Sequence, residues 1–138
     1  MSIPDRIYHD PGLIDRAPFT PVQVELLDCL LTRHHDGFVR DEHLAKILCS
    51  SHFWVPAFVV SLVGEHVIEI LQRIRDGIQG VDPQPYHKFL MDNPDFYLIT
   101  KQRVLSYWDC YYKSQRREDY PGFQIVEYFE RVMTASTE

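Results

Sequence analysis

The sequence predicts an all-α protein, organised as a compact single-domain bundle of four main helices and one or two short helices. Apolar residues recur every three or four positions through most of the chain, which is the spacing of an amphipathic helix. The 138 residues suffice to bury a core within one domain. Only the run at residues 96–99 resembles a strand, and because no second strand is predicted to pair with it, we expect extended or turn structure there.

Residues 1–18 are predicted to form an irregular N-terminal arm that packs on a helical domain at residues 19–138, because prolines interrupt any sustained period in the arm. The first helix is predicted to begin after Thr20, whose hydroxyl suits an N-cap. Pro21 suits the first helical position, and Gln23 completes a capping box with Thr20.

A short helix capped by Asp41 is expected to precede residues 53–71, the most apolar segment of the chain. On a helical wheel this segment is apolar all round at its start and amphipathic later. We therefore predict one continuous central helix that ends near Gly77. Leu71 lies within its apolar stripe, so Leu71→Ala is expected to lower the free energy of unfolding by roughly 2–5 kcal/mol.

The C-terminal third contains most of the aromatic residues. It is predicted to form a short helix at residues 86–91, an amphipathic helix with Thr100 as its N-cap, and a last helix that follows a turn at residues 120–123.

Glu65, His66 and Glu69 are the best candidates for catalytic chemistry, because a continuous helix would place them on one broad face. Carboxylates and an imidazole at this spacing can bind a divalent metal or transfer protons. The His-Glu-x-x-His motif and a repeated Glu-x-x-His motif are both absent. This pattern is more often a solvated helix face, and in that case Glu65→Ala should cost far less stability than Leu71→Ala.

A second candidate surface combines aromatic and basic residues near the end of the predicted Thr100 helix. Tyr107, Tyr111 and Tyr112 cover a wide arc of that helix, and Arg116 and Arg117 follow it. Tyrosine and arginine are enriched in protein interfaces, although aromatic residues at helical spacing also form cores. We expect at least one of these tyrosines, with one of the two arginines, to be exposed and to contact a protein partner or a second copy of the chain.

The net charge of −6 disfavours a nucleic-acid partner, because an acidic chain lacks general attraction for phosphate backbones. Charged residues interrupt the apolar segment at 53–71, so we expect no membrane span. The three widely spaced cysteines indicate reduced, mostly buried thiols in a cytoplasmic protein. Nucleophile motifs, glycine-rich phosphate loops and paired metal ligands are absent, so no cofactor or metal is expected.

The leading interpretation is a non-enzymatic protein-interaction, adaptor or regulatory protein. One alternative is a metal-dependent or acid–base enzyme that uses a cleft at Glu65, His66 and Glu69. A further alternative is a protein that binds a small molecule in an aromatic-lined pocket.

Overall fold

The computed structural model describes residues 6–135, and within that range the chain forms seven α-helices and no β-strand. The predicted all-α class is confirmed. The helices outnumber the four main and one or two short helices that the sequence predicts. They are α1 (Pro21–Leu31), α2 (Gly37–Ile47), α3 (Val55–Val63), α4 (Ile68–Ile78), α5 (Gln84–Asp92), α6 (Pro94–Tyr111) and α7 (Pro121–Thr134), with 3-10 turns η1 (Pro11–Leu13) and η2 (Arg117–Asp119).

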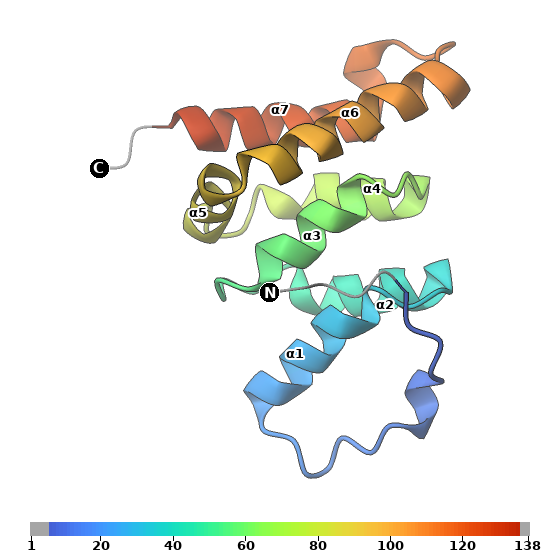
Figure 1. Cartoon of the computed structure of the whole chain (residues 1–138), viewed down its shortest axis with the longest axis vertical. Coiled ribbons are helices and arrows are strands. Elements are labelled where there is room, and N and C mark those ends of the chain that lie inside the picture. The colour runs from blue at the N-terminus through green and yellow to red at the C-terminus, as the bar shows by residue number, and fades with distance from the viewer. Residues whose placement is uncertain (1–5, 136–138) are drawn as a thin grey trace.

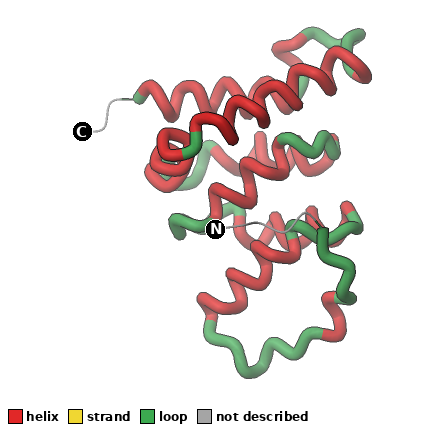
Figure 2. Tube along the Cα trace, in the orientation of Figure 1, coloured by secondary structure: helices red, strands yellow, loops and turns green. Residues whose placement is uncertain are grey.

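The helices stack in three layers that follow the order of the chain (Figure 1). The layers are α1 with α2, α3 with α4, and α6 with α7. α5 packs on α3, α6 and α7. The middle layer contacts both outer layers, since α3 touches α1 and α6 while α4 touches α2 and α7. Figure 2 shows that the segment before α1 is mostly loop and curves away from the bundle. The core therefore centres on α3 and α4.

The prediction of one continuous central helix is wrong, because the chain turns between α3 and α4. α3 ends at Val63, and three residues later His66 adopts a φ of 68°, in the left-handed region that a continuous right-handed helix excludes. Val67 is extended and precedes α4 as its N-cap residue. The turn places α4 beside α3, so that the two helices pack on each other. Leu71 is fully buried in the stripe of α4, as the helical wheel predicts.

The start of the first helix agrees with the prediction. The Thr20 hydroxyl accepts a hydrogen bond from the Gln23 amide at 3.2 Å, and the Gln23 side chain accepts one from the Thr20 amide at 2.9 Å.

The predicted cap of the second helix is wrong. α2 begins four residues before Asp41, and Asp36 caps it by accepting a hydrogen bond from the Phe38 amide at 2.9 Å.

The expectation of extended structure at residues 96–99 is also wrong. α6 begins at Pro94, which suits the first helical position, and it continues through these residues. Thr100 is therefore not an N-cap. It is buried within α6, where its hydroxyl donates a hydrogen bond to the carbonyl of Phe96 at 3.0 Å.

The described part of the N-terminal arm is attached to the helical domain by backbone hydrogen bonds. The Ile7 amide donates to the carbonyl of Arg33, and the His35 amide donates to the carbonyl of Ile7, both at 2.9 Å. Residues 1–5 of the predicted arm lie outside the described residues.

No helix in the described range is both long and apolar enough to cross a bilayer.

The cysteines differ in burial, and the expectation of mostly buried thiols is wrong. Cys29 is buried in α1, whereas Cys49 and Cys110 are exposed. Burial, together with the nearby Glu25 and Asp28 carboxylates, raises the pKa of Cys29 to about 12.

Gly122→Ala is expected to destabilise the protein by roughly 1–3 kcal/mol, because the added methyl group overpacks a filled site. A Cβ at Gly122 would lie 2.6 Å from the ring of Tyr120 and 2.9 Å from Cγ1 of Val104, and both neighbours are buried. Urea denaturation measures the change. Gly80→Ala is the control, since its Cβ would lie 3.8 Å from the carbonyl oxygen of Gly77, an ordinary van der Waals contact. Equal stability of the two variants would contradict this packing.

Candidate functional site

Glu65 lies in the turn between α3 and α4, where three arginines converge on its carboxylate. Arg33 Nη1 donates a hydrogen bond to Glu65 Oε2, and Arg6 Nη1 lies 3.4 Å from both carboxylate oxygens. Arg40 Nε lies 3.7 Å from Glu65 Oε1. We call these four residues the Glu65 cluster. They come from the arm, the turn after α1, α2 and the α3–α4 turn. The cluster therefore links four separate segments of the chain.

Three of the four side chains in the Glu65 cluster are shielded from water, whereas that of Arg6 is 36% exposed. The side chains of Arg33, Arg40 and Glu65 are 7%, 8% and 12% exposed. Arg40 also donates hydrogen bonds to the carbonyls of His34 and His35, at 2.9 and 3.1 Å. Burial lowers the pKa of Arg40 below the usual value of a guanidinium, while the Glu65 carboxylate opposes this shift. The carboxylate thus serves as the counter-charge for arginines that are shielded from water.

His66, the next residue, is fixed against α6. Its ring stacks on Tyr107 with the planes 10° apart, and its Nδ1 atom is buried without a hydrogen-bond partner among the described residues. Burial, together with the positive charge of Arg103, lowers the pKa of His66 to about 4. The imidazole is therefore neutral at pH 7.

A pocket of about 390 Å³ opens beside these residues. We call it the arginine pocket, and it is lined by Arg6, Gly64, Glu65, His66, Arg103, Ser106 and Tyr107. Arg103 and Ser106 reach it from successive turns of α6. A Cβ on Gly64 would lie 3.3 Å from Cδ of Arg103, so the absence of a side chain at this position lets α6 approach the turn closely.

The structure places two of the predicted catalytic candidates beside a residue of the predicted interaction surface, and it separates the third candidate from them. Glu65 and His66 lie beside Tyr107, which the sequence assigns to the interaction surface. Glu69 is exposed on α4, beyond the turn, and lines a different pocket with Arg73. Arg73 pairs with Asp41, at 2.6 and 3.0 Å. The three residues Glu65, His66 and Glu69 therefore do not form one face.

The other predicted contact residues differ in exposure. Tyr111 is 70% exposed and lies against Tyr107, with ring centroids 5.1 Å apart. Tyr112 is half-buried and stacks on Tyr120. Both arginines are exposed. The Arg117 guanidinium lies 5.1 Å from the centroid of the Trp108 ring, and Arg116 lies 3.4 Å from Glu118 and 3.6 Å from Asp119.

Sequence reasoning missed Arg6, Arg33, Arg40 and Arg103. They stand in four different segments with no shared spacing, and no local pattern distinguishes them from surface arginines. Only the fold shows that they surround one turn.

A second buried charge cluster lies on α1. Asp28 is 5% exposed, accepts a hydrogen bond from Arg16 at 3.1 Å and lies 2.7 Å from Nδ1 of His43.

Nearby, Ser50 and Glu25 both contact the same Nδ1 atom of His52. A nucleophile triad needs the hydroxyl and the acid on opposite ring nitrogens, so this group lacks that geometry.

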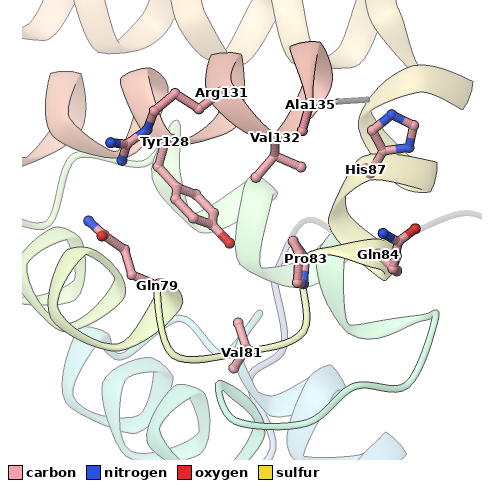
Figure 3. A pocket seen from close by; sticks show the side chains of 9 residues that line it. All are labelled: Gln79, Val81, Pro83, Gln84, His87, Tyr128, Arg131, Val132 and Ala135. Carbon is pink, nitrogen blue, oxygen red and sulfur yellow. The ribbon is translucent and has the colours of Figure 1, made fainter. Parts of the chain in front are cut away.

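Another pocket, of about 320 Å³, lies between the α4–α5 loop, α5 and α7 (Figure 3). Tyr128 extends from α7 toward the loop that carries Val81 and Pro83, and Arg131 and His87 lie at its edge. Among the described residues that line this pocket, Tyr128 is the only Phe, Tyr or Trp.

Glu65→Ala is expected to lower the free energy of unfolding by about 3–5 kcal/mol, because it leaves Arg33 and Arg40 buried without this carboxylate. This reverses the expectation of a small cost for a solvated residue. Glu69→Ala is the matched control, and it should cost no more than about 1 kcal/mol, since Glu69 is an exposed carboxylate in the first turn of α4. Chemical denaturation compares them, and a smaller loss for Glu65→Ala would refute a stabilising role of the cluster.

His66 is expected to titrate near pH 4 in NMR spectra of the imidazole protons. Between pH 6.5 and 4 the unfolded imidazole binds a proton that the folded one does not, so acidification through this range lowers stability. His66→Gln removes this part of the decline and also assigns the resonance. Titration of His66 near pH 6.5 would contradict the buried, stacked ring.

Comparisons with protein-family models, with curated proteins and with solved structures found no match to this chain.

Proposed function

We propose that the chain is a non-enzymatic interaction protein that binds a second copy of itself through the outer face of α1. The orientation of α1 supports this proposal. Asp28 and Cys29 point into the protein and are 5% and 0% exposed, whereas Val22, Leu26 and Leu30 are 45%, 37% and 40% exposed. An amphipathic helix normally buries such a stripe, so an exposed one marks a contact surface.

The charge pairing of Asp28 explains why α1 is oriented in this way. Its carboxylate contacts both Arg16 and His43, and His43 is 2% exposed in α2. Rotating α1 to bury Leu26 would pull Asp28 away from these partners and leave a buried charge unpaired. The exposed stripe is therefore fixed by the polar side of the same helix.

The composition of the outer face favours a second copy as the partner. The exposed residues of α1 are Pro21, Val22, Gln23, Leu26 and Leu30, none of which is charged. Such a face can meet its own copy across a twofold axis without like-charge contacts, although the chain carries a net charge of −6. Its aliphatic residues are four positions apart, the spacing of a ridge in helix packing.

An apolar pocket of about 370 Å³ extends this face. It lies between the arm and α1, where Leu13, Ile14 and Leu27 contribute to its lining. Leu13 is 83% exposed, so a helix laid along α1 would also cover this residue.

That the aromatic and basic surface at the end of α6 contacts a protein partner stays a prediction. Tyr111 and Arg116 provide its exposed part, while Tyr107 and Tyr112 are half-buried by ring stacking. The outer face of α1 is more continuous, and we therefore favour it.

The acid–base enzyme receives less support. The Glu65 carboxylate is occupied by arginines, which also repel a divalent cation, and Glu69 lies on the other side of the turn. Within residues 6–135, no three His, Cys, Asp or Glu side chains lie close enough to share a metal ion.

The double variant Val22→Ser, Leu26→Ser is expected to weaken dimerisation by tenfold or more. Each substitution removes apolar area from the interface and should lower the free energy of association by roughly 1 kcal/mol or more. Sedimentation equilibrium measures the association. Thermal stability should change little, since both side chains are already partly exposed. Leu98→Ser on α6, where Leu98 is 52% exposed, is the control and should leave the dimer intact. A wild-type chain that stays monomeric at high micromolar concentration would refute the proposal.

A further inference from the structure

We infer that the pocket between the α4–α5 loop, α5 and α7, the Tyr128 pocket, binds a small organic monocarboxylate (Figure 3). The carboxylate pairs with Arg131, and the apolar body of the ligand packs on Tyr128 and Val132. The elements that form this pocket do not include α1, so the inference does not depend on dimerisation.

The hydroxyl of Tyr128 is the first feature that points to a ligand. Tyr128 is 8% exposed and extends from α7 into the pocket, toward the α4–α5 loop (Figure 3). Among residues 6–135 this hydroxyl has no hydrogen-bond partner, and it is not fully enclosed as those of Tyr86, Tyr97 and Tyr120 are. A buried tyrosine normally finds a partner for its hydroxyl. A ligand in the pocket supplies one.

Arg131 is the second feature, because its guanidinium is free to bind an anion. It is the only residue with a permanent positive charge among the described residues that line the pocket. Within residues 6–135 its side chain makes no ion pair and no hydrogen bond. Glu127 lies four positions earlier on α7, the spacing of a helical ion pair, and does not form one with it. A guanidinium offers a planar fork of N–H donors that matches the two oxygens of a carboxylate.

The acidic residue next to the lining, Asp82, does not cancel this charge. Its Oδ1 atom accepts a hydrogen bond from the Gln84 amide at 3.0 Å. Burial raises the pKa of Tyr128, and the positive charge of Arg131 opposes this shift more strongly than the negative charge of Asp82 adds to it. Arg131 therefore outweighs Asp82 at the hydroxyl that the ligand meets. One unpaired cation in the lining matches a ligand with a single negative charge.

The layout of the pocket suits a carboxylate carried at one end of an apolar body. In Figure 3, Arg131 lies on one side of the Tyr128 ring, and Gln84 and His87 lie on the other. The Tyr128 ring and Val132, which is 7% exposed, provide apolar surface. The volume of about 320 Å³ lies at the lower end of the range of about 300–1,000 Å³ found for small-molecule sites, so the ligand is small.

Titrations followed by NMR test the inference with phenylacetate and phenylacetamide, which share a ring and a similar shape and differ in charge. Phenylacetate should bind about tenfold more tightly, because only the acid forms charge-assisted hydrogen bonds with the guanidinium. Arg131→Gln should abolish this preference. It is expected to lower the affinity for phenylacetate to that for phenylacetamide, and to leave the affinity for phenylacetamide nearly unchanged.

Arg103→Gln is the matched control. It makes the same change of charge at an exposed arginine of α6 that lines the arginine pocket, and it should leave both affinities unchanged. Arg131 is also exposed, so Arg131→Gln should unfold at nearly the wild-type temperature. Val22→Ser, Leu26→Ser should bind phenylacetate normally, so the two proposals fail independently.

The same spectra locate the bound probe. The amide signals of Val81, Gln84 and Val132 should shift on addition of phenylacetate, while those of the arginine pocket should not. Three results would each overturn the inference: no saturable shift at these three residues with millimolar phenylacetate, equal affinity for the acid and the amide, or a preference for the acid that survives Arg131→Gln.

Discussion

The attachment of the N-terminal layer depends on one carboxylate that is shared by several guanidinium groups. Glu65 pairs with Arg6, Arg33 and Arg40, which belong to three different segments that precede α3 in the chain. Removing charges from water is costly, and the cost is offset only while the partners stay together. Glu65 lies two residues after the end of α3, and His66, which follows it with a φ of 68°, turns the chain toward α4.

The two ends of the molecule are stabilised by different interactions. In the N-terminal layer, buried charges fix the helices, through the Glu65 cluster and through the contacts of Asp28 with Arg16 and His43. In the C-terminal layer the contacts are mainly apolar and aromatic, for example Tyr97 and Tyr86 packing around Phe129. Charge pairs tolerate few alternative geometries. The contacts of Asp28 can therefore hold α1 in place with this carboxylate directed inward.

Local sequence predicted those features that depend on local physics. The capping box at Thr20 needs only neighbouring residues, and the buried stripe of α4 follows from helical spacing alone. The turn at His66 was not predicted, because apolar spacing continues across it and the turn is stabilised by a distant ring on α6. Glu65 and His66 were recognised as candidates for the site, but their arginine partners were not, since residues 6, 33, 40 and 103 come together only after folding. The direction in which α1 faces also depends on tertiary charge pairing.

The layers stack in chain order, which has a consequence for the protein during its synthesis. Each layer pairs helices that are consecutive in the chain, such as α1 with α2 and α3 with α4, and local contacts of this kind favour rapid folding. As the chain leaves the ribosome, α1 and α2 emerge before the turn that contains Glu65. The pairing of Arg33 and Arg40 with Glu65 can form only after α3 is complete and the carboxylate has emerged. The first helical pair to be synthesised therefore reaches its final form only after the middle layer has emerged.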